Sequence, residues 1–122
     1  MDKITIAEKF ARFSDRWSPR IVGEANGQYV KLAKGEGVPP WHAHEHEDEI
    51  FLVFSGLLRL EFRDREPVDL GPGEMCIVSR RVEHRPSADV ETHLMLIEPK
   101  ATAHTGDVQS EQTVALEDQA WI

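Results

Sequence analysis

The sequence contains a single cysteine and no long apolar stretch. Because Cys76 is the only cysteine among the 122 residues, no disulfide can form within the chain. No apolar run approaches the roughly 20 residues that a membrane-spanning helix needs, and the Met-Asp-Lys start lacks the apolar core of a signal peptide. We therefore expect a protein of the reducing cytoplasm with no membrane partner.

Basic residues are also scarce. The chain has 14 lysine and arginine residues against 22 aspartate and glutamate residues, which gives a formal net charge of −8. Phosphate backbones repel a surface of this charge, so we expect no nucleic-acid partner. With 122 residues and 40% hydrophobic content, the chain is long enough for one domain with its own core.

The N-terminal part of the chain combines a short helix with β-rich runs. Thr5 and Glu8 have the spacing of a capping box, which predicts a helix over residues 6–13. The Asn26-Gly27 pair is typical of a tight hairpin turn. It joins two β-rich runs, residues 20–24 and 28–34.

The rest of the chain reads as short strands. Residues 50–54 are apolar at every position, so both faces of this strand should be buried. Cover for its outer face would come from the N-terminal segment or from a second subunit. Residues 57–63 alternate between apolar and charged side chains, as in a strand with one wet face. Further strands are predicted at residues 68–70, 74–79 and 92–97. Such strands, separated by Gly and Pro turns, indicate an all-β sandwich or barrel.

The most unusual stretch is residues 42–49, which holds three histidines and four carboxylates. On a strand, His42 and His44 point to the same side, about 7 Å apart, and can converge on one ion. A chain reversal after His44 would bring the Glu49 carboxylate to the same ion. Imidazole and carboxylate ligands suit Fe, Mn, Ni, Zn or Cu. His44, His46 and Glu49 form an alternative set of opposite phase, and the residues alone leave both sets open.

Two segments resemble the motifs of the cupin superfamily, and of small single-domain bacterial cupins in particular. Four residues match the first motif in type and spacing: His42, His44, Glu49 and Gly56. The second motif is matched in spacing by Gly73, Ser79, Arg81 and His84. The sequence departs from the family pattern at Glu36, Ser79, Arg81 and Ala88, where glycine, proline, glycine and asparagine are usual.

The resemblance implies a fold and a ligand set. The fold is a double-stranded β-helix, the jelly-roll or cupin barrel, usually dimeric, with a short N-terminal helix added here. The implied cofactor is one divalent transition metal per chain, Fe, Mn, Ni, Zn or Cu, held by His42, His44, Glu49 and His84. We expect residues 1–34 to pack on the barrel or on a partner subunit, residues 35–98 to form its core, and residues 99–122 to pack back.

Other residues carry weaker signals. We expect Phe51, Met75 and His93 to line a substrate pocket. The three arginines near His84 suit an anionic ligand group, although pairing with surface acids is the simpler interpretation; they are Arg80, Arg81 and Arg85. His104 begins a polar tail that we interpret as an ordinary loop.

Two classes of function fit these expectations. The first is a metal-dependent enzyme that acts on a small oxygen-rich substrate, a sugar or a carbonyl acid, as an isomerase, epimerase or dioxygenase, with the metal as Lewis acid. The second is a non-catalytic module that binds or senses a small molecule at the metal. The same fold and ligand set serve both classes, so the sequence does not decide whether the protein is catalytic. In both cases a small-molecule ligand and a homodimer are expected.

Overall fold

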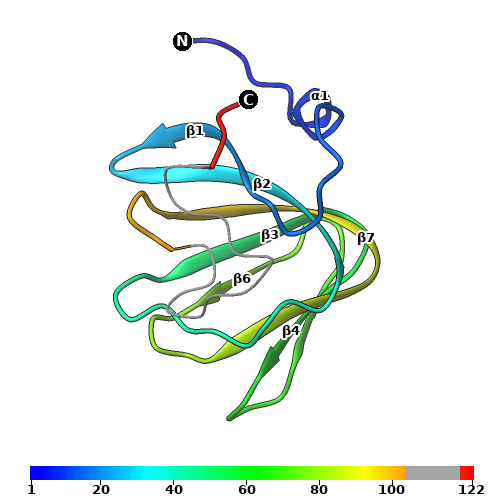
Figure 1. The fold of residues 1–122 in the computed structure, drawn as a ribbon, viewed down its shortest axis with the longest axis vertical. Helices are drawn as coiled ribbons and strands as arrows, with labels where there is room; N and C mark the ends of the chain where they lie inside the picture. The colour runs from blue at the N-terminus through cyan, green and yellow to red at the C-terminus, as the bar shows by residue number, and fades with distance from the viewer. Residues whose placement is uncertain (104–118) are drawn as a thin grey trace.

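In the residues that the structure describes, the protein is an antiparallel β-barrel with one short helix (Figure 1). The computed structural model describes residues 1–103 and 119–122. Along the chain the elements are α1 (Ile6–Phe10), β1 (Arg20–Ala25), β2 (Gln28–Gly37), β3 (Glu49–Ser55), β4 (Leu58–Phe62), β5 (Val68–Leu70), β6 (Met75–Val78) and β7 (His84–Pro99). The all-β jelly roll expected from the sequence is confirmed.

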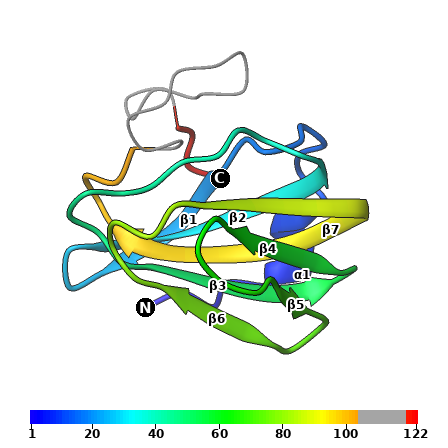
Figure 2. The ribbon, with the colours of Figure 1, turned by 90° about the horizontal axis from the view of Figure 1, so that it is seen from below.

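The long strand β7 joins the two layers of the barrel. One layer has the strand order β1-β2-β7-β3-β6, with the C-terminal half of β7 between β2 and β3. The N-terminal half of β7 pairs with β4, which in turn pairs with β5 in the second layer. Figures 1 and 2 show β7 curving from one layer into the other. The inner faces of both layers therefore enclose one core.

Side chains that alternate along the strands fill this core. Its buried members are Trp17, Ala33, Phe51, Val53, Leu58, Leu60, Leu70, Val78, Ala88, Leu94 and Leu96. The alternation predicted for residues 57–63 is confirmed, since Leu58 and Leu60 are fully buried and Arg59 between them is exposed. In the described residues, 1–103 and 119–122, no helix has the length and apolar character needed to cross a membrane.

Two glycine-containing turns fix the strand connections. The β1–β2 hairpin closes between Ala25 and Gln28, with φ of 52° at Asn26 and 77° at Gly27. These positive angles confirm the predicted tight turn. After β3, Gly56 has φ of 88°, and a Cβ atom there would lie 2.4 Å from Thr92 Oγ1. Only glycine fits this turn, which explains physically why the first motif ends in a glycine.

The helix is shorter than predicted. It ends at Phe10, and the Thr5 side chain makes no hydrogen bond at its N-cap, so the capping-box prediction is wrong. Packing holds the helix instead, because Phe10 and Phe13 bury themselves against Val22 and Leu32 on the outer side of β1 and β2. The C-terminal residues lie beside β1 (Figure 1), where the Ile122 amide donates to the Ile21 carbonyl at 3.0 Å.

The outer face of β3 and β6 is more open than the sequence predicts. Phe51 and Val53 face the core and are buried, but Phe54 on the opposite face is 40% exposed. Next to β3, Met75 and Ile77 of β6 are 56% and 55% exposed. The expectation that both faces of residues 50–54 are buried is therefore wrong for the single chain at Phe54, which Phe10 of the N-terminal helix contacts without covering it fully.

Candidate metal centre

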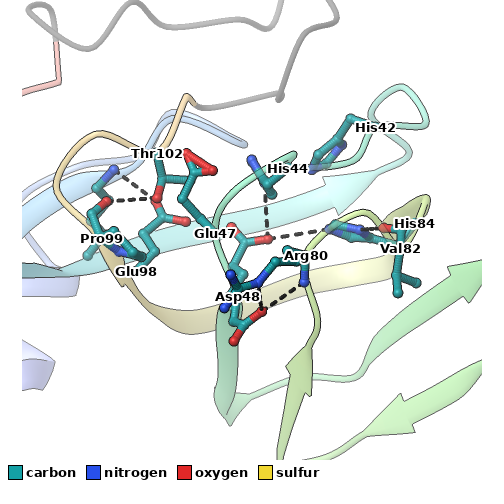
Figure 3. Close-up of polar contacts among 12 residues, drawn as sticks. His42, His44, Glu47, Asp48, Arg80, Val82, His84, Glu98, Pro99 and Thr102 are labelled. Carbon is teal, nitrogen blue, oxygen red and sulfur yellow. Dashed lines mark hydrogen bonds and ion pairs between the residues drawn. The ribbon is translucent and has the colours of Figure 1, made fainter.

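Backbone hydrogen bonds join the two histidine-containing segments. The amide of His42 donates to the His84 carbonyl at 3.0 Å, and the amide of His84 donates back to the His42 carbonyl at 2.8 Å. The amide of Arg81 donates to the His44 carbonyl at 2.7 Å. Residues some 40 positions apart in the sequence thus lie side by side at one end of the barrel (Figure 3).

Four potential metal ligands come together inside the barrel. They are His42, His44, Glu49 and His84, and their ligand atoms all lie within 4.8 Å of one another. Strand alternation turns Glu49 inward with Phe51, at the start of β3. The exposed fractions of the four residues are 7%, 4%, 4% and 1% respectively. Such burial sets the group apart from a solvated acidic turn.

Backbone carbonyls orient two of the imidazole rings. His42 Nδ1 lies 3.2 Å from the Pro40 carbonyl oxygen. His84 Nδ1 lies 2.8 Å from the Val82 carbonyl oxygen (Figure 3). A carbonyl oxygen only accepts hydrogen bonds, so Nδ1 must carry the hydrogen in both rings. The neutral rings are therefore in the tautomer whose Nε2 carries a lone pair, and this lone pair can bind a metal.

Three atoms at the centre of the group lack hydrogen-bond partners. Nε2 of His44 and Nε2 of His84 lie 3.4 Å and 3.3 Å from Oε1 of Glu49, yet none of the three atoms makes an aligned hydrogen bond. Each unpaired buried polar atom costs about 1–3 kcal/mol. A cation between these atoms removes that cost, because two lone pairs and a carboxylate then face a positive charge.

The spacing also fits a transition-metal ion. Imidazole nitrogen and carboxylate oxygen bind such ions at about 2.0–2.2 Å, so ligand atoms around one ion lie up to about 4.4 Å apart. The 4.8 Å limit found here requires a contraction of only a few tenths of an ångström. Three imidazoles and one carboxylate suit Fe, Mn, Ni, Zn or Cu, and leave positions open on a five- or six-coordinate ion.

Comparison with known proteins agrees with this fold. The sequence profile of the cupin domain matches residues 28–99. The chain belongs to the cupin family. It is 30% identical over 114 residues to the Bacillus subtilis (strain 168) protein YdbB, covering 93% of this chain and 87% of YdbB.

Among solved structures, a cupin-2 domain protein of Shewanella frigidimarina NCIMB 400 is similar, with 43% identity, a TM-score of 0.76 and coverage of 79% of this chain and 93% of that one. Protein NMB1881 of Neisseria meningitidis has 28% identity and a TM-score of 0.74, with coverage of 80% and 99%.

Electrostatics within the cupin's ligand group favour the metal-binding forms of His42 and Glu49, whereas in the absence of an ion they favour the protonated form of His44. Burial and the neighbouring His84 lower the pKa of His42 to about 4, so this ring is neutral at physiological pH. Burial alone would raise the pKa of Glu49, but its contacts with His44 and His84 hold that pKa well below its ordinary value. Burial acts to lower the pKa of His44, yet the Glu49 carboxylate outweighs it and raises that pKa.

A buried ion pair behind Glu49 has no counterpart in the sequence prediction. Lys31 Nζ donates to Glu98 Oε1 at 2.8 Å, and the two residues are 0% and 2% exposed. Burial and the nearby Glu49 charge raise the pKa of Glu98 well above its ordinary value. One signal was available in the sequence: Glu98 is in phase with Leu94 and Leu96, which face the core.

Three other charged or titratable residues of the 42–49 stretch, Glu45, His46 and Asp48, are exposed. His46 is exposed and lies outside the group of four, so the alternative ligand set that includes it is not assembled. The arginines near His84 pair with acids, as the simpler interpretation predicts. The pairs are Arg80 with Asp48 at 3.3 Å, Arg81 with Glu45 at 3.6 Å, and Arg85 with Glu61. Arg81 has φ of 68°, a left-handed conformation at the position where the family usually has glycine.

The three residues predicted to line a substrate pocket lie on two different sides of the sheet. Phe51 lines a cavity together with His42 and Glu49, and its role in a substrate pocket stays a prediction. Met75 and His93 lie instead on the outer side of the sheet, where Met75 is more than half exposed and His93 stacks on Phe10. Their placement near the ligands is therefore wrong, because both point away from the core face of their strands. The predicted loop at His104 lies outside the described residues.

Proposed function

We propose that this cupin holds one divalent transition metal between His42, His44, Glu49 and His84, and that it is an enzyme acting on a small oxygen-bearing substrate at this metal. The observation that carries the proposal is the group of unpaired buried atoms, His44 Nε2, His84 Nε2 and Glu49 Oε1. Leaving these buried atoms unpaired destabilises the folded protein, and a cation that binds between them restores the lost free energy.

The chemistry of the proposed enzyme follows from the ligand set. When bound, the metal supplies a Lewis acid with open positions for a substrate oxygen. Glu49 partly neutralises the ion, and the carbonyl contacts of His42 and His84 keep both rings in the metal-binding tautomer. The barrel walls exclude bulk water from the four ligands, which are all at least nine-tenths buried.

One observation supports a second candidate, a binding or sensing module that does not turn its ligand over. The cavity next to the ligand group contains two titratable lining residues, His42 and Glu49, and both are ligands in the proposal. Isomerases and epimerases need a general acid or base near the substrate. Turnover of any sugar or carbonyl acid that requires the metal and stops with a chelator supports the enzyme, whereas tight ligand binding without product supports the module.

We also propose that two copies of the chain associate through the outer face of β3 and β6. Phe54, Met75 and Ile77 expose apolar side chains side by side on that face. Monomeric proteins seldom leave such a patch in water. Light scattering should give a mass near twice the 13.9 kDa of the chain. A mass that stays at the monomer value across the micromolar range would contradict this assignment.

Elemental analysis tests the metal proposal. Protein purified without added metal, or stripped and reloaded with one metal, should contain close to one ion per chain. The double variant His42→Ala/His84→Ala should contain almost none. A content far below one ion per chain, or one that the double variant leaves unchanged, would overturn the proposal.

A further inference from the structure

A cavity inside the barrel borders the candidate metal centre. It has a volume of about 40 Å³ and reaches two of the four ligands, His42 and Glu49. Among the described residues, 1–103 and 119–122, the other lining residues are all apolar: Trp17, Pro19, Ala33, Pro39, Phe51, Pro86, Leu94 and Leu96. A ligand that occupies an open metal position and extends into this cavity therefore meets hydrocarbon walls.

The wall chemistry discriminates between ligand classes. A sugar needs a hydrogen-bond partner for each hydroxyl group that it buries, and an unpaired buried hydroxyl costs binding free energy. In the part of the chain that the structure describes, the lining side chains other than His42 and Glu49 carry no free donor or acceptor; the Trp17 indole nitrogen already donates to the Glu36 carbonyl at 2.9 Å. An alkyl group, by contrast, gains from leaving water. These walls favour an apolar ligand body over a hydroxylated one.

The size of the cavity limits that body. One water molecule needs about 10–15 Å³ of such volume, and a cavity that takes benzene measures about 150 Å³. A volume of about 40 Å³ thus suits only a few carbon atoms.

The wall is also held in place. The Trp17 ring packs directly on Gly35, where an added Cβ would lie 2.5 Å from the ring. Any larger side chain at position 35 would push the ring, so this glycine fixes one side of the cavity. This packing of Trp17 on Gly35 means that the cavity is already formed in the protein without a ligand.

We propose that the metal-bound protein selects short-chain aliphatic carboxylates, including 2-oxo acids, whose oxygens reach the metal and whose alkyl group of about one to three carbon atoms fills this cavity, and that it rejects polyhydroxylated ligands such as sugars. An anionic head group suits a divalent ion that carries one carboxylate ligand. The inference rests on the proposed function, because the head group needs the metal.

A matched ligand pair tests the inference. Butyrate and 3-hydroxypropionate share the same carboxylate and nearly the same shape, and differ by a terminal methyl against a hydroxyl group. Protein loaded with one equivalent of Co²⁺ is titrated with each, following the visible absorption of the ion. Butyrate should bind at least about tenfold more tightly, as expected for one unpaired buried hydroxyl.

The outcomes separate this inference from the metal proposal. If Co²⁺ does not bind, the proposed function fails first. If Co²⁺ binds at one per chain but 3-hydroxypropionate binds as tightly as butyrate, or neither carboxylate binds, only the cavity inference is overturned.

Two serine variants assign the selectivity to the cavity. Ala33 lines it, whereas Ala88 is an equally buried core alanine that does not. Ala33→Ser adds a hydroxyl group to the wall and should narrow the preference for butyrate several-fold, while Ala88→Ser should leave it unchanged. An unchanged preference in Ala33→Ser, or an equal change in both variants, would overturn the assignment.

Discussion

The barrel buries two neighbouring groups of polar side chains, and they differ in how their charges are satisfied. In the first, Lys31 and Glu98 form an ion pair at 2.8 Å that supplies its own counter-charge. In the second, the four candidate ligands surround a point where two imidazole nitrogens and a carboxylate oxygen meet without an aligned hydrogen bond. The first group pairs its opposite charges within the protein, although Glu98 Oε2 has no hydrogen-bond partner. The second is complete only with a cation.

The two groups also touch. The pKa of Glu98 is raised by burial and by the charge of Glu49, which places the two carboxyl groups in one electrostatic environment. Lys31 therefore supports the charge balance behind the ligand group as well as its own pair. The comparison suggests that the ion pair serves the fold, and that the ligand group serves function at a cost to the metal-free fold.

Breaking the ion pair should produce the largest loss of stability. Lys31→Met leaves Glu98 buried beside Glu49 without its cation, and the loss of one partner from such a pair costs about 3–5 kcal/mol. The double variant Lys31→Met/Glu98→Leu should recover most of this. Urea unfolding measures both. A double variant as unstable as the single one would show that the pair is not the source of the loss.

Metal should stabilise the wild-type protein by a smaller amount. At a free metal concentration 100 times the Kd, binding to the folded state alone adds about 2.7 kcal/mol. Thermal unfolding with and without the metal measures this increment as a rise in Tm. His84→Ala should lose nearly all of the rise. An equal rise in this variant would mean that the stabilising ion binds elsewhere.

The metal-free protein should lose stability as the pH falls below 6.5. The pKa of His42 is 6.5 when unfolded and about 4 when folded, so the unfolded chain binds more protons between these values. The slope from this one group is at most about 1.4 kcal/mol per pH unit. The raised pKa of His44 acts in the opposite sense above pH 6.5, where its contribution is lost as the pH rises through the folded-state value.

Chelator-treated protein in urea unfolding at several pH values tests this window. His42→Ala should flatten the dependence between pH 6.5 and 4. A slope that the variant leaves unchanged would assign the effect to other groups.

The smallest expected effect is at His46. This residue is exposed and outside the ligand group, so His46→Ala should leave both metal content and Tm unchanged. Elemental analysis compares the metal content of this variant with that of His44→Ala, which should lose the metal. A loss of metal in His46→Ala would restore the alternative ligand set.

Sequence reasoning predicted the ligand group because its signal is local. The two-residue period of a strand puts His42 and His44 on one face, and the turn at Gly56, which only glycine fits, fixes the register of Glu49. The resemblance to cupins added His84. All of these signals depend only on the spacing of residues along the sequence.

The features that sequence reasoning missed depend on pairing across the barrel. Lys31 and Glu98 are 67 positions apart and meet only because β2 lies next to β7. The position of Met75 was predicted wrongly because the sequence of a short apolar strand does not show which face of the sheet each residue occupies. The Trp17 wall of the cavity comes from a segment before β1 whose path no local pattern specifies.

The central claim is that one transition-metal ion occupies the point between His42, His44, Glu49 and His84. Anomalous diffraction from crystals of the metal-loaded protein, collected on both sides of the absorption edge of the metal, tests it directly. We expect one strong anomalous peak per chain, about 2.0–2.2 Å from Nε2 of each of the three histidines and from a Glu49 oxygen. A peak among the exposed acids near His46, or no peak above noise in protein shown to contain metal, would contradict it.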